Sequence, residues 1–137
     1  MILVDTNVLV DVLSNEPQWA DWSIHQLKMQ SKIHVLSINP IIYAELSSAF
    51  TKIEDLENVV KIMQLKMIQM PRPALFLAAK AFHLYRQRGG VKHNVLGDFF
   101  IGAHAAVNQV PILTRDTQRY QTYFPTVRLI APNALHL

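Results

Sequence analysis

The chain has 137 residues, of which half are hydrophobic, a formal net charge of +3 at pH 7, and no cysteine. This length and composition indicate one globular domain spanning residues 1–137 and exclude an intrinsically disordered chain. The lack of cysteine excludes disulfides and thiolate metal sites, and no segment has the pattern of a signal peptide or the roughly 20 apolar residues of a membrane span. We therefore expect a soluble, cytoplasmic protein without membrane contacts, and its small positive charge weakly favours a polyanionic partner.

Short apolar runs alternate with helical spacings along the chain. The apolar runs predict five strands, at residues 1–4, 33–37, 67–70, 110–114 and 127–130. Apolar residues three and four positions apart predict helices at 6–13, about 17–27, 40–50, 54–63, 73–88 and 97–108, with a short helix or turn from 116. Asn39-Pro40 is typical of a helix start and Gly89-Gly90 of a helix end. This alternation predicts an α/β fold with a parallel sheet and right-handed crossovers.

Four acidic residues occupy positions that the predicted fold can bring together. Asp5 and Asp116 follow the first and fourth predicted strands, whose carboxyl ends can be neighbours at the switch point of a doubly wound sheet. Glu45 and Asp98 lie on otherwise apolar helix faces that can lean over the same edge. Carboxylates gathered in one pocket repel each other, and a divalent cation relieves that repulsion. Because all ligands would be oxygen atoms, we expect Mg²⁺ or Mn²⁺ rather than zinc.

Each acid also has a structural interpretation. Asp5 and Asp116 would serve as helix caps, Asp98 would stabilise the positive end of a helix, and Glu45 would reach a basic partner or the rim of the core. Histidine offers no competing metal site, because the six histidines form no HxH, HxxxH or HExxH motif. His104 lies six residues from Asp98, on a different side of the predicted helix, which favours a core or surface role.

Several segments together resemble the PIN-domain nuclease family, and in particular the VapC-type toxins of bacterial toxin–antitoxin pairs. These segments are MILVDTNVLVD at the start, Glu45 in its mid-chain helix, DFFIGAHA, and LTRD followed by YQTYFP. The order of the four acids, with their strand and helix contexts, carries the resemblance, which covers nearly all of the chain. It implies a PIN-like three-layer α/β fold in which helices flank a parallel sheet of five strands.

The resemblance also implies a site and a function. Four acids match the metal-binding and catalytic residues of the family: Asp5, Glu45, Asp98 and Asp116. Three polar residues match positions that support the site: Thr6, Asn7 and Thr114. The implied activity is hydrolysis of RNA phosphodiester bonds by an endoribonuclease that depends on Mg²⁺ or Mn²⁺. Members of this kind commonly form homodimers and are blocked by a cognate antitoxin protein.

Basic residues near the glycine-containing loop and the predicted pocket are candidates for contacts with RNA phosphates. They are Arg86, Arg88, Lys92, His93 and Arg115. Any one of them is better explained as a solvated surface charge. The sequence shows no array of aromatic and basic residues that marks an RNA-reading surface, and Tyr120, Tyr123 and Phe124 are expected to pack beneath the last strand.

Other classes of protein also place an acid at the end of the first strand. A haloacid-dehalogenase-like phosphotransferase needs a second Asp two residues later, where this chain has Asn7. A receiver domain needs paired acids before the first helix and a lysine after the last strand, and neither is evident. A catalytically inactive PIN-like scaffold that binds RNA or protein is the remaining alternative. The sequence leaves open one metal ion or two, and a toxin or a housekeeping nuclease.

Overall fold

The computed structural model of the protein describes residues 1–92 and 94–132. Its strands are β1 (Ile2–Val4), β2 (Leu36–Ile38), β3 (Lys66–Met67), β4 (Ile112–Leu113) and β5 (Leu129–Ile130). All neighbouring strands are parallel, and their order in the sheet is β3-β2-β1-β4-β5. β1 is therefore the central strand, and the order of the strands reverses direction between β1 and β4.

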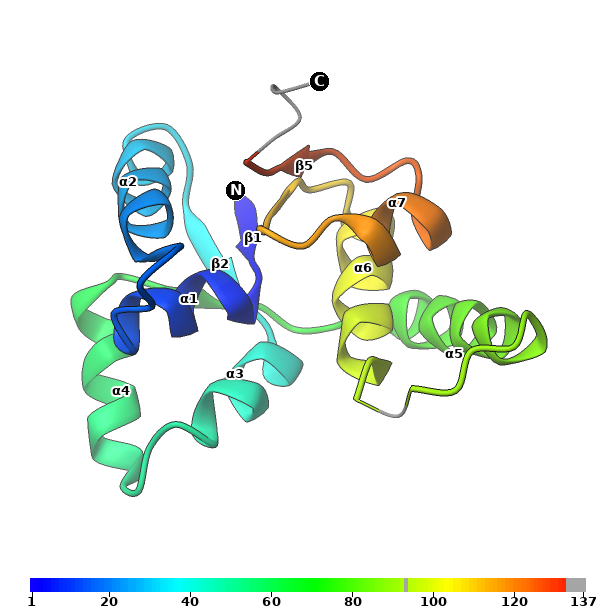
Figure 1. Cartoon of the computed structure of the whole chain (residues 1–137), viewed down its shortest axis with the longest axis horizontal. Helices are drawn as coiled ribbons and strands as arrows, with labels where there is room; N and C mark the ends of the chain where they lie inside the picture. Colours follow the sequence, from blue (N-terminus) through cyan, green and yellow to red (C-terminus); the bar gives the residue numbers. More distant parts are fainter. Residues whose placement is uncertain (93, 133–137) are drawn as a thin grey trace.

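Helices cover both faces of this sheet. They are α1 (Thr6–Leu13), α2 (Ala20–Ser31), α3 (Pro40–Ser47), α4 (Ile53–Ile62), α5 (Arg72–Gln87), α6 (Leu96–Asn108) and α7 (Gln118–Tyr123). Figure 1 shows α1 to α4 on one side of the sheet and α5 to α7 on the other. The predicted three-layer α/β fold with a parallel sheet is confirmed.

The ends of three elements around the carboxyl edge of the sheet follow from local sequence. All of β1 is buried, and Asp5 caps α1 by accepting a hydrogen bond from the backbone N–H of Thr6. The Asn39 side chain caps α3 as predicted, because it accepts a hydrogen bond from the N–H of Ile42. α3 in turn contacts both α1 and α6. These contacts bring the starts of α1 and α6 and the helix that carries Glu45, α3, to one edge.

Some predicted boundaries near the start of the chain were wrong. The second strand begins at Leu36 rather than at 33, because Ile33 completes the turn after α2 and 74% of it is exposed. α2 begins at Ala20 rather than near Pro17. There the Glu16 carboxylate accepts hydrogen bonds from two backbone N–H groups and holds a separate turn ahead of the helix.

Three further boundaries differ from the prediction. β3 is a two-residue edge strand whose side chains are exposed, so an apolar strand at 67–70 does not form. α3 ends at Ser47 rather than near Phe50, where serine hydroxyls donate to carbonyls of the preceding turn. α7 begins at Gln118 with Thr117 at its cap position, so Asp116 is not the cap. No helix among the described residues has the length and apolar character needed to cross a membrane.

Candidate metal-binding site

Asp5 is the central acid of the site. It ends the buried strand β1, and only 4% of it is exposed. Its Oδ1 accepts a hydrogen bond from the backbone N–H of Thr6 over 2.8 Å. Its Oδ2 accepts hydrogen bonds from the hydroxyls of Thr114, over 2.9 Å, and Tyr120, over 2.8 Å. Asp5 is therefore both a helix cap and a carboxylate fixed from several sides.

Thr114 and Asn7 join the two strands at the switch point. β1 pairs with β4 so that Val4 lies beside Leu113, and the next residues, Asp5 and Thr114, emerge together at the edge. The Asn7 side chain donates to Thr114 Oγ1 over 3.2 Å and lies 3.4 Å from Asp5 Oδ2. It also accepts a hydrogen bond from the backbone N–H of Arg115. The predicted supporting residues thus form one hydrogen-bond network around Asp5.

Glu45 reaches the same edge from α3. Its Oε1 accepts a hydrogen bond from the Thr6 hydroxyl. Its Oε2 lies against Gly97, so closely that a Cβ atom on that glycine would overlap it. No basic side chain in the described part of the chain pairs with Glu45, so the basic partner of the structural interpretation is wrong. Its other form, a position at the rim of the core, agrees with the half-buried side chain.

Asp98 approaches from the other side of the edge. It stands in the first turn of α6, where the helix dipole favours a negative charge, as the structural interpretation predicted. Its Oδ2 lies 3.4 Å from a guanidinium nitrogen of Arg119 on α7. A single ion pair of this length at a partly exposed position compensates the charge of Asp98 only in part.

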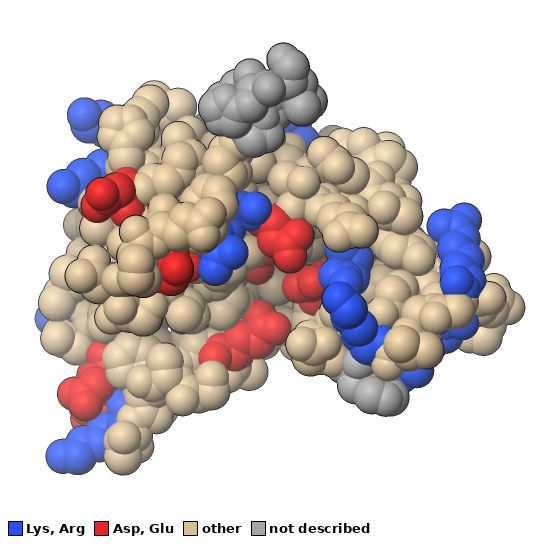
Figure 2. All heavy atoms as spheres, viewed as in Figure 1, with Lys and Arg blue, Asp and Glu red and all other residues tan. Residues whose placement is uncertain are grey.

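Three of the four predicted acids line one cleft. Its volume is about 390 Å³, and Asp5, Glu45 and Asp98 line it with Thr6, Asn7, Val10, Ser48 and Arg115. Figure 2 shows acidic side chains at the hollowed centre of this face, with basic side chains beside them. Asp116 is exposed and is not among the described residues that line the cleft, although its charge acts on Asp98.

The electrostatics of the cleft follow from this crowding. Burial raises the pKa of Asp5 to about 6, although hydrogen bonds from Tyr120 and Thr114 oppose the shift. Burial and then repulsion by Asp5 raise the pKa of Asp98 to about 7, against the opposing charge of Arg119. Glu45 and Asp116 also raise the pKa of Asp98. A cation between these carboxylates would favour their ionised forms.

The donor set fits a hard divalent cation that keeps part of its water shell. Every side chain in the cleft lining that can bind a metal ion does so through oxygen: a carboxylate, a hydroxyl or the amide oxygen of Asn7. Oxygen ligands suit Mg²⁺ or Mn²⁺. No three His, Cys, Asp or Glu side chains in residues 1–92 and 94–132 are arranged to hold an ion directly. Mg²⁺ characteristically binds through one or two carboxylates and several waters, and the open cleft leaves room for them.

Several residues next to the acids were not predicted. Tyr120 was expected only to pack, which it does, with 2% of it exposed, but its hydroxyl also bonds Asp5. Gly97 and Arg119 contact Glu45 and Asp98. Asp11 is 1% exposed and accepts two hydrogen bonds from the Arg115 guanidinium, over 2.7 and 3.0 Å. No sequence pattern around any of these residues predicts its role, because each contact joins segments that are distant in the chain.

Two of the predicted RNA-binding residues, Arg86 and Arg88, lie over aromatic rings, and so does Arg119, which was not predicted. The guanidinium groups of Arg86, Arg88 and Arg119 stand 5.1 to 5.8 Å from the ring centres of Phe82, Tyr123 and Tyr85, respectively. The Lys92 backbone N–H donates to the Tyr85 hydroxyl over 3.1 Å. These rings pack around Phe99 of α6, so aromatic and basic side chains that form no motif in the sequence lie next to one another in the fold. His93 lies outside the described residues.

A family model supplies the decisive comparison. The model described as PIN domain matches residues 2–125. The chain belongs to the PIN domain family. A comparison of this PIN domain with curated protein sequences found no match.

Solved structures share the fold of this PIN domain. VapBC2 from Rickettsia felis, bound to a promoter DNA fragment, matches with a TM-score of 0.73 and 22% identity, over 97% of this chain and 100% of that chain. FitAcB from Neisseria gonorrhoeae matches with a TM-score of 0.70 and 22% identity, over 100% of both chains. A toxin–antitoxin complex from Klebsiella pneumoniae matches with a TM-score of 0.65 and 19% identity, over 97% of this chain and 98% of that chain.

Proposed function

We propose that this PIN domain is an endoribonuclease that depends on Mg²⁺ or Mn²⁺ and acts in the cytoplasm as the toxin of a toxin–antitoxin pair. The observation that carries the proposal is the convergence of Asp5, Glu45 and Asp98 on one cleft at the carboxyl edge of the sheet. A protein maintains buried carboxylates with raised pKa values only at a cost in stability, and such groups concentrate at functional sites.

Each residue of the cleft has a distinct part in this mechanism. Asp5, Glu45 and Asp98 bind the cation directly or through water, and Asp116 at the rim acts through water or at a second ion. Thr6, Asn7 and Thr114 orient these ligands through hydrogen bonds. When bound, the cation lowers the pKa of an attacking water and stabilises the charge of the phosphate. No side chain serves as a covalent nucleophile.

The substrate must bring a polyanion to an acidic cleft, so basic groups have to flank it. Arg119 contacts Asp98 of the cleft, and Arg86, Arg88 and Lys92 adjoin the aromatic rings of α5 and α7 on the same side; their charge would contact RNA phosphates. The aromatic rings beneath them offer faces for unpaired bases. Arg115 lines the cleft itself, although its charge is compensated by Asp11.

The fold comparisons support an antitoxin partner, because one of the similar chains belongs to a structure described as a toxin–antitoxin complex. An apolar hollow of about 320 Å³ adjoins the cleft and shares Glu45 with it. Ile41, Ala44, Leu96 and Phe100 line this hollow. An antitoxin segment with an apolar side chain in this hollow and a basic side chain in the cleft would block the site. The toxin itself would act as a homodimer.

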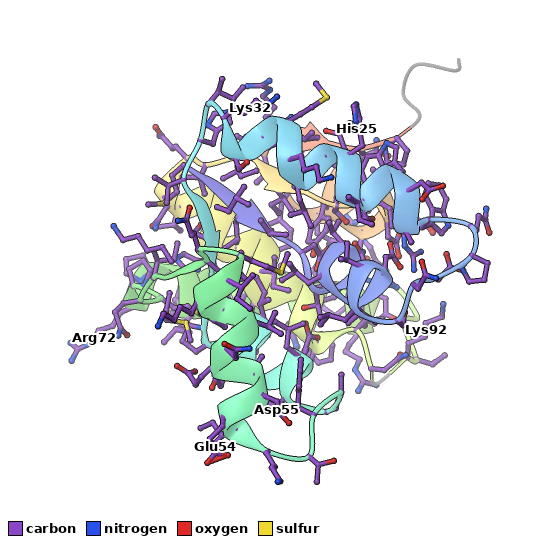
Figure 3. The ribbon with its side chains drawn as sticks, turned by 90° about the vertical axis from the view of Figure 1, so that its left-hand side faces the viewer. His25, Lys32, Glu54, Asp55, Arg72 and Lys92 are labelled. Carbon is purple, nitrogen blue, oxygen red and sulfur yellow. The ribbon has the colours of Figure 1, made fainter. Side chains whose placement is uncertain are left out.

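The direct experiment measures cleavage of mixed RNAs by the purified chain with Mg²⁺, Mn²⁺ or EDTA. We expect cutting with either metal, none with EDTA, and a loss of about a hundredfold or more in Asp98→Asn and Asp5→Asn. Asp55→Asn is the matched control, because Asp55 is an exposed acid near the start of α4 (Figure 3) and is not among the described residues that line the cleft. Metal-dependent cutting that survives both cleft substitutions would remove the site assignment.

The alternative is a PIN-like scaffold that binds RNA or protein without cutting. The observation that favours it is the lack of three acidic or histidine side chains, among the described residues, arranged to hold an ion directly. Expression in cells separates the two functions. A toxic nuclease arrests growth and Asp98→Asn relieves the arrest, whereas a scaffold would give the same growth with either form.

A further inference from the structure

The hydroxyl of Tyr120 bonds the acid at the centre of the cleft although packing does not require it. Tyr120 lies on α7, is 2% exposed and belongs to the apolar core. A buried hydroxyl is unfavourable unless it forms a hydrogen bond, and a phenylalanine ring would fill the same space. The hydroxyl donates to Asp5 Oδ2 over 2.8 Å. The hydroxyl therefore acts on the Asp5 carboxylate and not on the packing of the core.

The hydrogen bonds of Asp5 are unequally divided between its two oxygens. Oδ2 accepts bonds from the hydroxyls of Tyr120 and Thr114, and Asn7 lies 3.4 Å away. Oδ1 accepts one bond, from the N–H of Thr6. Because a carboxylate oxygen offers about two acceptor directions, Oδ2 is fully used and Oδ1 keeps one free.

The direction from which Tyr120 approaches also matters. Asp5 lines the cleft, but Tyr120 is not among the described residues that line it. The phenol therefore meets the carboxylate from the interior of the fold and cannot block a ligand. Its ring is held in the core, so the position of its oxygen is set by the packing of α7.

We propose that Tyr120 is a positioning residue that turns the Asp5 carboxylate so that Oδ1 alone faces the cleft and binds the divalent cation. The inference rests on the proposed metal site and names the oxygen and the helix that determine its geometry. Groups that orient metal ligands in this way typically change metal affinity roughly 10- to 100-fold. The position of α7 (Gln118–Tyr123) would thus determine the orientation of the Asp5 carboxylate, more than a hundred residues earlier in the sequence.

The test is an electron paramagnetic resonance titration of free Mn²⁺ with the full chain. Tyr120→Phe deletes one hydroxyl and keeps the ring, and we expect it to weaken Mn²⁺ binding about tenfold. Tyr43→Phe is the matched control, because Tyr43 is half-buried, is not among the described residues that line the cleft, and donates a solvent-exposed hydrogen bond to the Glu57 carboxylate over 2.6 Å. Its Mn²⁺ affinity should equal that of the wild type.

The outcomes separate this inference from the proposed function. If the wild type binds Mn²⁺ in a manner that Asp98→Asn abolishes, but Tyr120→Phe binds it equally well, the role of Tyr120 is refuted and the metal site stands. If the wild type binds no more Mn²⁺ than Asp98→Asn, both fail. Should Tyr120→Phe not fold, Thr114→Val removes the other hydroxyl donor to Oδ2, and unchanged affinity there would equally contradict the inference.

Discussion

Gly97, in the first turn of α6, lies in direct contact with the Glu45 carboxylate of α3. A Cβ atom at this position would overlap Glu45 Oε2 and come close to the side chain of Ile41. The glycine therefore allows α6 to pack against α3 with a carboxylate between them. It also leaves the space that Glu45 occupies while its Oε1 accepts the hydrogen bond from the Thr6 hydroxyl.

Gly97→Ala should impair activity more than stability. The added methyl group pushes the end of a flexible side chain, so the fold adapts, but Glu45 leaves its position and RNA cleavage falls about ten- to a hundredfold. Gly89→Ala is the control, because Gly89 has a φ of 88° and nothing near its Cβ position, so it should lose stability and keep its activity. Cleavage rates and urea midpoints check both, and full activity of Gly97→Ala would contradict the role of Glu45.

Without divalent cations, Asp98→Asn should make the protein more stable at alkaline pH. The pKa of Asp98 is raised from 3.8 to about 7 in the folded state, so the folded protein holds a proton that the unfolded chain has released. Stability therefore falls as pH rises from about 4 to about 7, and the asparagine variant escapes this loss. Thermal melts in EDTA should show a higher Tm for the variant at pH 8 and little difference near pH 4. Equal Tm values of the two proteins at every pH would show that the pKa of Asp98 is not raised in the folded state.

The Asp11–Arg115 ion pair should stabilise the fold chiefly because Asp11 is buried. The Asp11 side chain is 2% exposed, against 30% for Arg115, and it also accepts a hydrogen bond from Ser23. Arg115→Met leaves a buried carboxylate without its cation and should lower the free energy of unfolding by about 3 kcal/mol. Adding Asp11→Asn should restore part of that loss. Urea unfolding of the single and double variants measures this, and additive losses would argue against the pairing.

The arginines beside the cleft should bind RNA through its phosphates. In a cleavage-deficient Asp98→Asn background, Arg88→Gln should weaken RNA binding and reduce the slope of log affinity against log salt by about 0.7 for each lost phosphate contact. Arg72→Gln is the matched control, because Arg72 begins the same helix, α5, that Arg88 caps at its other end. Figure 3 shows Arg72 directed away from the side on which Lys92 lies. Equal slopes for the two variants would place the RNA elsewhere.

The acids that line the cleft could be predicted from sequence because their positions depend on topology. Asp5 stands at the end of a fully apolar strand, and a parallel sheet with short helical crossovers brings the ends of its first and fourth strands together. Glu45 was recognisable as an acid on an apolar helix face. Asp116 was predicted to share the cleft, but it precedes Thr117, the cap residue of α7, and its side chain is exposed outside the cleft lining.

The remaining contacts depend on packing that no local pattern specifies. Tyr120 reads as an ordinary core aromatic, and only the angle of α7 decides that its hydroxyl meets Asp5. Gly97 reads as a small residue in an apolar helix, and its significance comes from the distance between α6 and α3. The aromatic rings beneath Arg86, Arg88 and Arg119 come from α5 and α7 and pack against a ring of α6, so no continuous stretch of sequence predicts that they lie together.

The most direct test of the central claim is the anomalous scattering of Mn²⁺ in crystals of the wild-type chain. We expect a strong peak in the cleft, among the carboxylates of Asp5, Glu45 and Asp98, with one ligand bond of about 2.2 Å to Asp5 Oδ1. The peak should disappear in Asp98→Asn crystals soaked in the same way. A cleft without a peak at Mn²⁺ concentrations that support RNA cleavage, or an unchanged peak in the variant, would contradict it.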